Sequence, residues 1–512
     1  MPSSFLPLLL AAVLRAEVVP PQVAGGFYPG DASELGAAVD SFLAAASSGA
    51  VKGEILGLLS PHAGYSYSGA TAGQAYAQVK GHSYETVIIL SAGHRVALRG
   101  AATLFGGALE TPLGRVPIDA AVAARLRSLS PGIEVLPRAF EGEHSVEVQL
   151  PFLQRALQPG WKAVPLLMNT EDLEASRRVG EAVAKVFKAG RTLLVVSSDL
   201  SHYPESGAAR VADLAVLSAL TSRPDDPAYF QLAGRALMRR GVPGLDTTAC
   251  GESGILAALY AMRRIGGVAR LLRYTNSGEG PGGDRSRSVG YAAAAWVRGA
   301  ATPRTRSLSA ESRKNLLGLA RRALTMKVAQ GKDPESAFWR EPEWNLPEAV
   351  FVTLTSRESS APGPSGLPDR PAGPGDLRKA APGRLRGCVG SLAPNMALAD
   401  AVQYFAVEAA LRDHRFPPVE ASELPGLRIE ISRLSPFRRV KSGAEVKPGQ
   451  GVVVRQGERR GLFLPQVWAQ LPDKAAFLGE VCEQKAGLPR DCWKDPKTDI
   501  EVFDDEAFEE SE

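Results

Sequence analysis

Four of the six histidines in this 512-residue chain stand beside apolar runs, where the sequence turns polar. They are His62, His94, His144 and His202. His62 follows EILGLLSP, His94 follows ETVIILSAG and His202 follows TLLVVSSDLS, while His144 in EGEHS precedes a helical pattern. Because ligands bind beyond the carboxyl ends of strands in open α/β sheets, we expect these imidazoles to converge. Together they would form a metal or proton-transfer site, whereas one isolated histidine would more readily bond a loop carbonyl.

Cys250 stands in TTACGES, directly before a helical pattern. The positive end of a helix dipole favours a thiolate there, and a thiolate with neutral imidazoles suits a first-row transition metal. Thiolate and imidazole are also the parts of a Cys–His hydrolase, and a lone cysteine can simply be a small buried hydrophobe. Four histidines exceed what the hydrolase mechanism requires, which favours the metal.

Two acidic residues stand close to these histidines in the sequence. Asp199 and His202 lie three residues apart in SSDLSH, and Glu143 directly precedes His144 in EGEHSVE. A carboxylate beside an imidazole can orient a metal-bound ring or relay protons. Both pairs therefore predict that kind of chemistry around one sheet edge.

Buried strands and amphipathic helices alternate from about residue 19 to residue 299, and these elements must position the candidates. Strands are predicted at residues 55–59, 87–90, 163–167 and 193–197, and a helix over 173–187. Further helical patterns follow Ser145 and Gly251. Strand–helix–strand spacing of this kind predicts right-handed crossovers and a largely parallel central sheet.

A second domain is expected, because a chain of this length exceeds one core. Residues 300–312 have the composition of a linker, and residues 313–503 hold a separate apolar pattern that starts with a helix. The Pro/Gly-rich stretch 357–384 is predicted to be a mobile surface loop, and the acidic tail 504–512 to be disordered.

Composition gives two opposed indications of compartment. The chain has four cysteines and no Cys-x-x-Cys pair, which is no disulfide framework and favours a reducing, cytoplasmic setting. FLPLLLAAVL, within residues 1–18, has the length of a signal h-region but lacks a preceding Lys or Arg, so export is the alternative to a disordered N-terminus. No later apolar run is long enough to span a bilayer.

The motifs SPHAGYSYSG, LSAGHRV, EGEHSVEVQLPFLQ, VVSSDLSHY, ACG and SVGYAAA occur in this order and resemble the Memo (mediator of cell motility) family over residues 19–299. The resemblance implies an α/β fold similar to the class III extradiol dioxygenases. It also implies an iron or copper site whose ligands match His62, His94 and Cys250. Arg95 stands where a second histidine is commoner, and Cys250 replaces the carboxylate of the true dioxygenases, which argues against ring cleavage.

The second unit resembles the AMMECR family, which implies a smaller α+β fold. The resemblance rests on LRGCVGSL, HRFPPV, LRIEISRLSP, RGLFLPQVW and CEQKAGLPRDCW. Arg386 and Cys388 stand in a Gly-rich turn that could hold a ligand, although a buried structural thiol is as good an explanation. Interleaved aromatics and a basic stripe are lacking, so we expect no nucleic-acid binding.

The two units in one chain resemble the AmmeMemoRadiSam association, which implies a separate radical SAM protein as partner. We therefore expect metal-dependent redox chemistry on a small substrate. His62, His94 and Cys250 would hold the metal. His144 and His202 would move protons, and Asp199 would orient or ligate. The alternative is a copper- or iron-binding scaffold without turnover, which a closed ligand set would favour.

Overall fold

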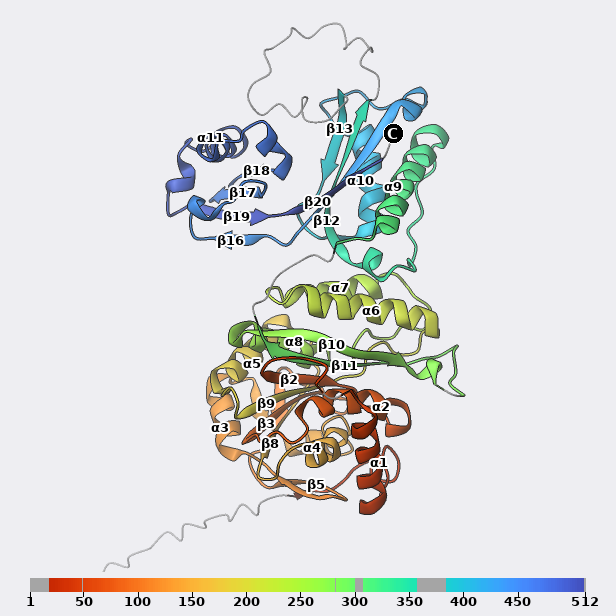
Figure 1. Cartoon of the computed structure of the whole chain (residues 1–512), viewed down its shortest axis with the longest axis vertical. Helices are drawn as coiled ribbons and strands as arrows, with labels where there is room; N and C mark the ends of the chain where they lie inside the picture. Colours follow the sequence, from red (N-terminus) through yellow and green to blue (C-terminus); the bar gives the residue numbers. More distant parts are fainter. Residues whose placement is uncertain (1–17, 48, 281, 300–306, 357–383, 511–512) are drawn as a thin grey trace, which may run out of the picture. The chain divides into compact units, whose positions relative to one another are not determined.

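The computed structural model describes residues 18–510 except for 48, 281, 300–306 and 357–383. It forms two compact units, residues 1–302 and 303–512 (Figure 1). The apolar leader, most of the linker and nearly all of the Pro/Gly-rich loop lie outside the described residues. In the described part, no helix is both long enough and apolar enough to cross a membrane.

The first unit contains an eight-stranded mixed sheet in the order β10-β11-β2-β9-β3-β8-β4-β7. Its four central strands are parallel and confirm the predicted strands. They are β2 (Ile55–Ser60), β9 (Thr192–Ser197), β3 (Thr86–Ala92) and β8 (Lys162–Met168).

The edges of this sheet differ from the largely parallel arrangement that was predicted. Strands β10 (Gly267–Asn276), β11 (Gly290–Arg298) and β4 (Ala101–Thr103) run antiparallel to inner neighbours, and β7 (Ile133–Val135) is parallel to β4. The described residues between β10 and β11 include no α-helix, and an antiparallel pair needs no crossover helix. The parallel prediction therefore holds only where helices connect the strands.

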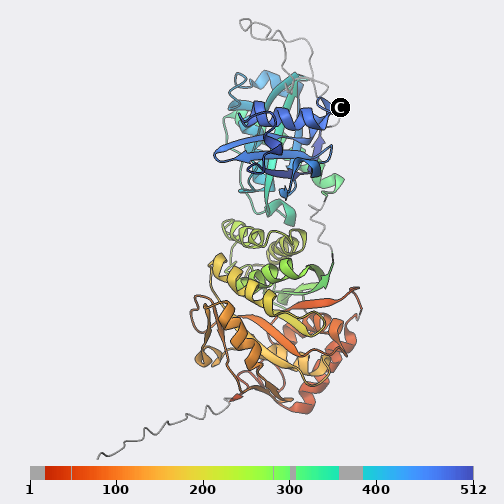
Figure 2. The same ribbon diagram turned by 90° about the vertical axis from the view of Figure 1, so that its left-hand side faces the viewer.

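Helices cover both faces of the sheet, so β2, β3 and β9 are buried along their whole length. One face carries α1 (Ala32–Ala45), α2 (Tyr65–Tyr76) and α4 (Leu150–Ala156); the other carries α3 (Ala120–Leu129), α5 (Leu173–Val186) and α8 (Glu252–Ile265) (Figures 1 and 2). Helices α6 (Ser206–Ser222) and α7 (Ala228–Met238) pack against each other, α6 also against β10 and α7 against α8. Helices α5 and α8 approach closely at Gly180, where a Cβ atom would lie 2.3 Å from the Ala257 carbonyl oxygen.

Two smaller groups of strands complete the sheets. A three-stranded sheet in the first unit holds β1 (Val18–Val19), β5 (Ala108–Thr111) and β6 (Gly114–Pro117). The second unit has a sheet of β13 (Arg384–Gly390), β12 (Pro347–Ser356), β15 (Leu427–Leu434) and β20 (Asp505–Glu509), with β14 (Met396–Ala397) paired to β12. Its other sheet holds β16 (Arg438–Val440), β19 (Asp499–Phe503), β17 (Gly451–Gln456) and β18 (Arg459–Phe463).

The helices of the second unit pack on these two sheets. Helices α9 (Ala310–Leu324) and α10 (Leu398–Leu411) cover the first sheet, while α11 (Lys474–Glu480) packs into the core beneath the second sheet. Helix α9 begins inside the predicted linker, because the Ser309 hydroxyl accepts the Ser312 N–H and caps it.

The described part of the acidic tail forms strand β20, which corrects the prediction that this tail is disordered. Strand β20 pairs antiparallel with β15. Arg313 donates to the Glu506 carboxylate at 2.7 Å, and Arg321 forms an ion pair with Glu510. Both arginines are far from the tail in the sequence. The composition of the tail therefore could not reveal that its carboxylates have cationic partners.

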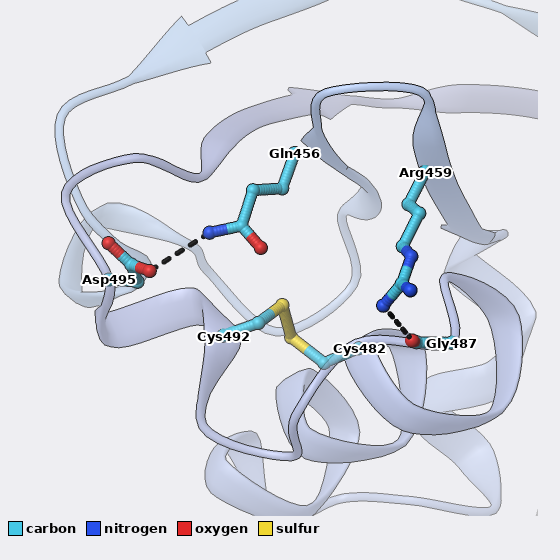
Figure 3. The surroundings of a disulfide bond; sticks show 6 residues. All are labelled: Gln456, Arg459, Cys482, Gly487, Cys492 and Asp495. Atoms are coloured by element: carbon cyan, nitrogen blue, oxygen red, sulfur yellow. Dashed lines mark hydrogen bonds between the residues drawn. A yellow bond between two sulfur atoms is a disulfide. The ribbon is translucent and has the colours of Figure 1, made fainter.

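Cys482 and Cys492 form a disulfide, although the cysteine count of the sequence indicated no disulfide framework (Figure 3). Both residues are buried, and the bond closes a short loop that begins in the π-helical turn η11 (Val481–Lys485). Hydrogen bonds from Gln456 to Asp495 and from Arg459 to the Gly487 carbonyl brace the same region. Because this disulfide is present, the cysteine content no longer favours a reducing compartment.

We expect a Cys482→Ala/Cys492→Ala double variant to lower the melting temperature of the second unit by about 6–12 °C. Closing a loop of this length stabilises by about 3 kcal/mol in the chain-entropy model, and 1 kcal/mol shifts a unit of this size by about 2–4 °C. Calorimetry without reductant measures the shift, and Cys250→Ala, in the other unit, is the control. An unchanged transition would contradict the stabilising role.

Candidate metal centre

Three of the four predicted imidazoles converge at one edge of the central sheet. His62 follows β2, His94 follows β3, and His144 lies in the loop before α4. One ring nitrogen from each lies within 4.8 Å of the others. The rings of His94 and His144 stack at 4.8 Å between centroids, and the His62 ring stands edge-on to both at 5.3 Å. Three converging nitrogen donors are a suitable start for a transition-metal site.

Hydrogen bonds fix which nitrogen of His62 faces this cluster. The Ser197 hydroxyl donates to the Ser145 carbonyl at 2.6 Å, so it accepts from His62 Nδ1 at 2.9 Å. Gln149 Nε2 also donates to Ser197 Oγ, at 2.9 Å. Since the hydroxyl hydrogen is already used, His62 carries its proton on Nδ1 and presents the lone pair of Nε2.

Glu143 orients His94 through the backbone N–H and Nδ1 of that histidine. Its carboxylate accepts the His94 backbone N–H at 2.7 Å and lies 3.0 Å from His94 Nδ1. The backbone N–H groups of His144 and Ser145 also point at Glu143, each at 2.9 Å. Burial alone would raise the pKa of Glu143, but the hydrogen bonds from His94 and Ser145 outweigh it and lower the pKa to about 2. The carboxylate is therefore ionised at neutral pH and holds Nε2 of His94 toward the cluster.

We expect Glu143→Gln to weaken metal binding by about 10–100-fold, the usual effect of losing a carboxylate that orients a ligating imidazole. The amide would turn an N–H₂ group toward backbone N–H donors. Titration of the metal-free protein with Co²⁺ or Cu²⁺ measures the affinity. The exposed neighbour changed in Glu141→Gln is the matched control. Equal affinities in the two variants would show that Glu143 does not orient a ligand.

Two imidazoles of the cluster are neutral at neutral pH. Burial, followed by the neighbouring imidazoles, lowers the pKa of His62 well below its usual value. Burial likewise lowers the pKa of His144 to about 4, despite the opposing charge of Glu143. Neutral imidazole is the form that binds a metal, so protons compete weakly here.

Cys250 lies beside the cluster at the start of α8, where its Sγ is 3.1 Å from His62 Nε2. It is not one of the three residues whose ligand atoms mutually converge. Burial raises the pKa of its thiol above the ordinary value, which corrects the expectation that the helix start favours thiolate. Desolvation outweighs the dipole, so only a bound cation would deprotonate this sulfur.

Asp199 and His202 flank the cluster without joining it. Asp199 Oδ1 accepts the backbone N–H groups of His62 at 2.8 Å and Ala63 at 3.3 Å, so the carboxylate fixes the loop of His62. Burial raises the pKa of Asp199 to about 7. His202 Nε2 is buried with no hydrogen-bond partner among the described residues, and burial lowers the pKa of that ring.

Sequence reasoning missed the residues that hold these loops. Nothing in the local sequence marks Ser197 and Gln149 as partners of His62. Asp213, on α6, accepts from the Ser201 N–H at 2.8 Å and from the Tyr274 hydroxyl at 2.9 Å, and it anchors the loop between Asp199 and His202. Arg95 donates to the Gly142 carbonyl and ties two loops of the site together. Glu143 was visible beforehand through its position next to His144, whereas the contact of Arg95 with Gly142 was not.

A polar cavity of about 330 Å³ adjoins Cys250. Asp246, Thr247, Glu252 and the buried hydroxyl of Ser253, which has no partner among the described residues, help to line it. This volume accommodates a small molecule.

Arg386 and Cys388 lie in strand β13, which corrects the prediction that they stand in a Gly-rich turn, and they have different surroundings. The Arg386 guanidinium donates to both Glu423 oxygens and to the Pro417 and Pro418 carbonyls, so it braces a loop. Cys388 lines a cavity of the second unit, and Arg386 is not among the residues that line this cavity.

Comparison with known proteins gives two family matches. The model for Memo-like proteins matches residues 20–295, and the AMMECR1 model matches residues 317–508. A MEMO1 family protein of Nitrosopumilus maritimus is 35% identical over 282 residues, covering 54% of this chain and 98% of that protein. A MEMO1 family protein of Aquifex aeolicus is 31% identical over 272 residues, covering 53% of this chain and 96% of the relative. A crystal structure of an uncharacterized Pyrococcus horikoshii protein matches at 33% identity with a TM-score of 0.34, over 40% of this chain and 94% of that chain.

Proposed function

Since this chain belongs to the Memo-like protein family and carries an AMMECR1 domain after its Memo domain, we propose that its first unit binds iron or copper and performs redox chemistry on a small substrate. The convergence of His62, His94 and His144 carries the proposal. Neutral nitrogen donors with a sulfur nearby fit these metals better than magnesium or calcium, which prefer oxygen.

The residues around the cluster take distinct parts in this proposal. A bound iron or copper ion supplies one-electron chemistry. His62, His94 and His144 hold it, so His144 is a ligand here and not the proton carrier first expected. Cys250 stands beside these three histidines, with its Sγ 3.1 Å from His62 Nε2. The cavity beside Cys250 receives the substrate.

Proton transfer falls to the two flanking groups. His202 offers a buried ring nitrogen that no described residue engages. Asp199 has a pKa of about 7, so it can hold or release a proton near neutral pH. We do not extend the proposal to ring cleavage, because a thiol stands near the histidines where the extradiol dioxygenases carry a carboxylate.

A second candidate function is metal storage or scaffolding without turnover, in which the chain docks a radical SAM partner. The 3.1 Å approach of Cys250 Sγ to His62 Nε2 favours it, because a fourth protein ligand would close the coordination. The unpartnered nitrogen of His202 and the adjoining cavity favour the enzyme.

Anaerobic purification followed by metal analysis and an oxygen-uptake screen tests the proposal. We expect about one iron or copper ion per chain, as for a single preformed site, and oxygen uptake that requires the ion. Metal without any uptake would favour storage. No binding after reconstitution with either ion would contradict both functions.

A further inference from the structure

A cavity of about 470 Å³ lies in the second unit, where the edges of its two sheets meet. Strand β13 is the outer strand of one sheet and β18 of the other, and both contribute to the wall. Phe351, Leu462 and Leu464 give it an apolar side, since they are only partly buried against the core between the sheets. An apolar ring or chain of a ligand would bury these exposed side-chain surfaces.

The rim of the same cavity is cationic. Arg412, Arg415 and Lys485 line it, and Asp413 is the only carboxylate among the described lining residues. That carboxylate is already engaged: it accepts the Cys388 backbone N–H at 2.8 Å and the Arg415 guanidinium at 2.6 Å. Asp413 thus neutralises Arg415 and binds a backbone N–H of the outer strand β13. Arg412 forms an ion pair with Glu408 at 3.3 Å, so Lys485 remains to attract an anion.

Lys485 is an exposed residue at this rim. Its ammonium lies 5.9 Å from the centre of the Phe463 ring, and none of the described residues forms an ion pair with it. Lys485 is the last residue of η11, and the disulfide between Cys482 and Cys492 fixes that turn (Figure 3). A cation positioned in this way, beside an apolar wall, suits a charge-assisted hydrogen bond to an oxyanion.

We propose that this cavity binds a small organic oxyanion, a carboxylate or phosphate monoester carried on an apolar body. Lys485 binds the charged group, and the wall of Phe351, Leu462 and Leu464 binds the body. Cys388 lines the cavity, so an occupied site shields it from reagents. The site is independent of the metal centre proposed for the first unit.

Phenyl phosphate and benzoate are the probes, and calorimetric titration of the full chain is the measurement. We expect one site per chain for at least one probe, while phenol and inorganic phosphate bind about tenfold more weakly or worse, because each lacks half of the ligand. Lys485→Gln should weaken binding of the tighter probe about tenfold, the effect of losing one charge-assisted hydrogen bond. Lys497→Gln, an exposed lysine of the same unit outside the cavity, should change nothing.

Alkylation by iodoacetamide locates the site, read peptide by peptide with mass spectrometry. The tighter probe should slow alkylation of Cys388 and leave Cys250, the other free cysteine, unaffected. Phenyl phosphate binding alone would assign phosphate monoesters, and benzoate alone would assign carboxylates. The proposal is overturned if neither probe binds at millimolar concentration, if Lys485→Gln binds as tightly as the parent, or if inorganic phosphate binds as tightly as phenyl phosphate.

Discussion

His62→Ala is expected to weaken metal binding by more than about 100-fold, beyond the loss caused by removing a group that only orients a ligand. His62 is the buried member of the cluster, and both other rings stand against it at 5.3 Å between centroids. Its Nε2 also lies 3.1 Å from Cys250 Sγ. Without His62, the imidazoles of His94 and His144 and the thiol of Cys250 remain, and these groups do not make a preformed metal site.

Metal content after reconstitution, measured by mass spectrometry, checks this prediction. His82→Ala is the matched control, because His82 is an exposed histidine of the same unit outside the cluster. Circular dichroism of both variants separates a lost ligand from a lost fold. A folded His62→Ala protein with wild-type metal content would place the metal elsewhere.

His202→Ala is expected to leave metal content near wild type while lowering any oxygen- or substrate-dependent turnover by about 10²-fold or more, the scale of a lost acid–base group. Its ring lies outside the three-histidine cluster, and its Nε2 has no partner among the described residues. That nitrogen can therefore exchange a proton without dismantling the cluster.

Oxygen uptake and metal analysis on the same His202→Ala sample separate the alternatives. Metal lost together with the side chain would make His202 a ligand, and equal turnover at equal metal loading would remove its catalytic role. His82→Ala again shows the effect of losing a histidine at an uninvolved position.

The central strands and the functional residues at their ends were predictable, because both are marked by residues that are neighbours in the sequence. Four runs of buried aliphatic residues fixed the parallel centre of the sheet, and polar residues at their ends placed His62 and His94 at one edge. Family resemblance added the identity of both domains. These features need no knowledge of which distant segments meet.

The features that were missed all depend on contacts that only the folded chain makes. The acidic tail forms a strand because Arg313 and Arg321 neutralise it. Desolvation raises the pKa of the Cys250 thiol, and a sequence does not show desolvation. Ser197 sets the tautomer of His62 only through contacts with two other loops. Pairing of Cys482 with Cys492 likewise becomes visible only once the turn brings them together.

The three histidines come from separate loops, so unfolding would scatter them and an ion held by all three would bind only the folded chain. By mass action, each tenfold excess of free metal over its dissociation constant then adds about 1.4 kcal/mol to the free energy of unfolding of the first unit. Metal starvation would thus shorten the lifetime of this unit in a cell before any reaction was lost, since the metal-free population opens more often to proteases. The second unit contains none of the three histidines, so its own stability would not follow the metal supply.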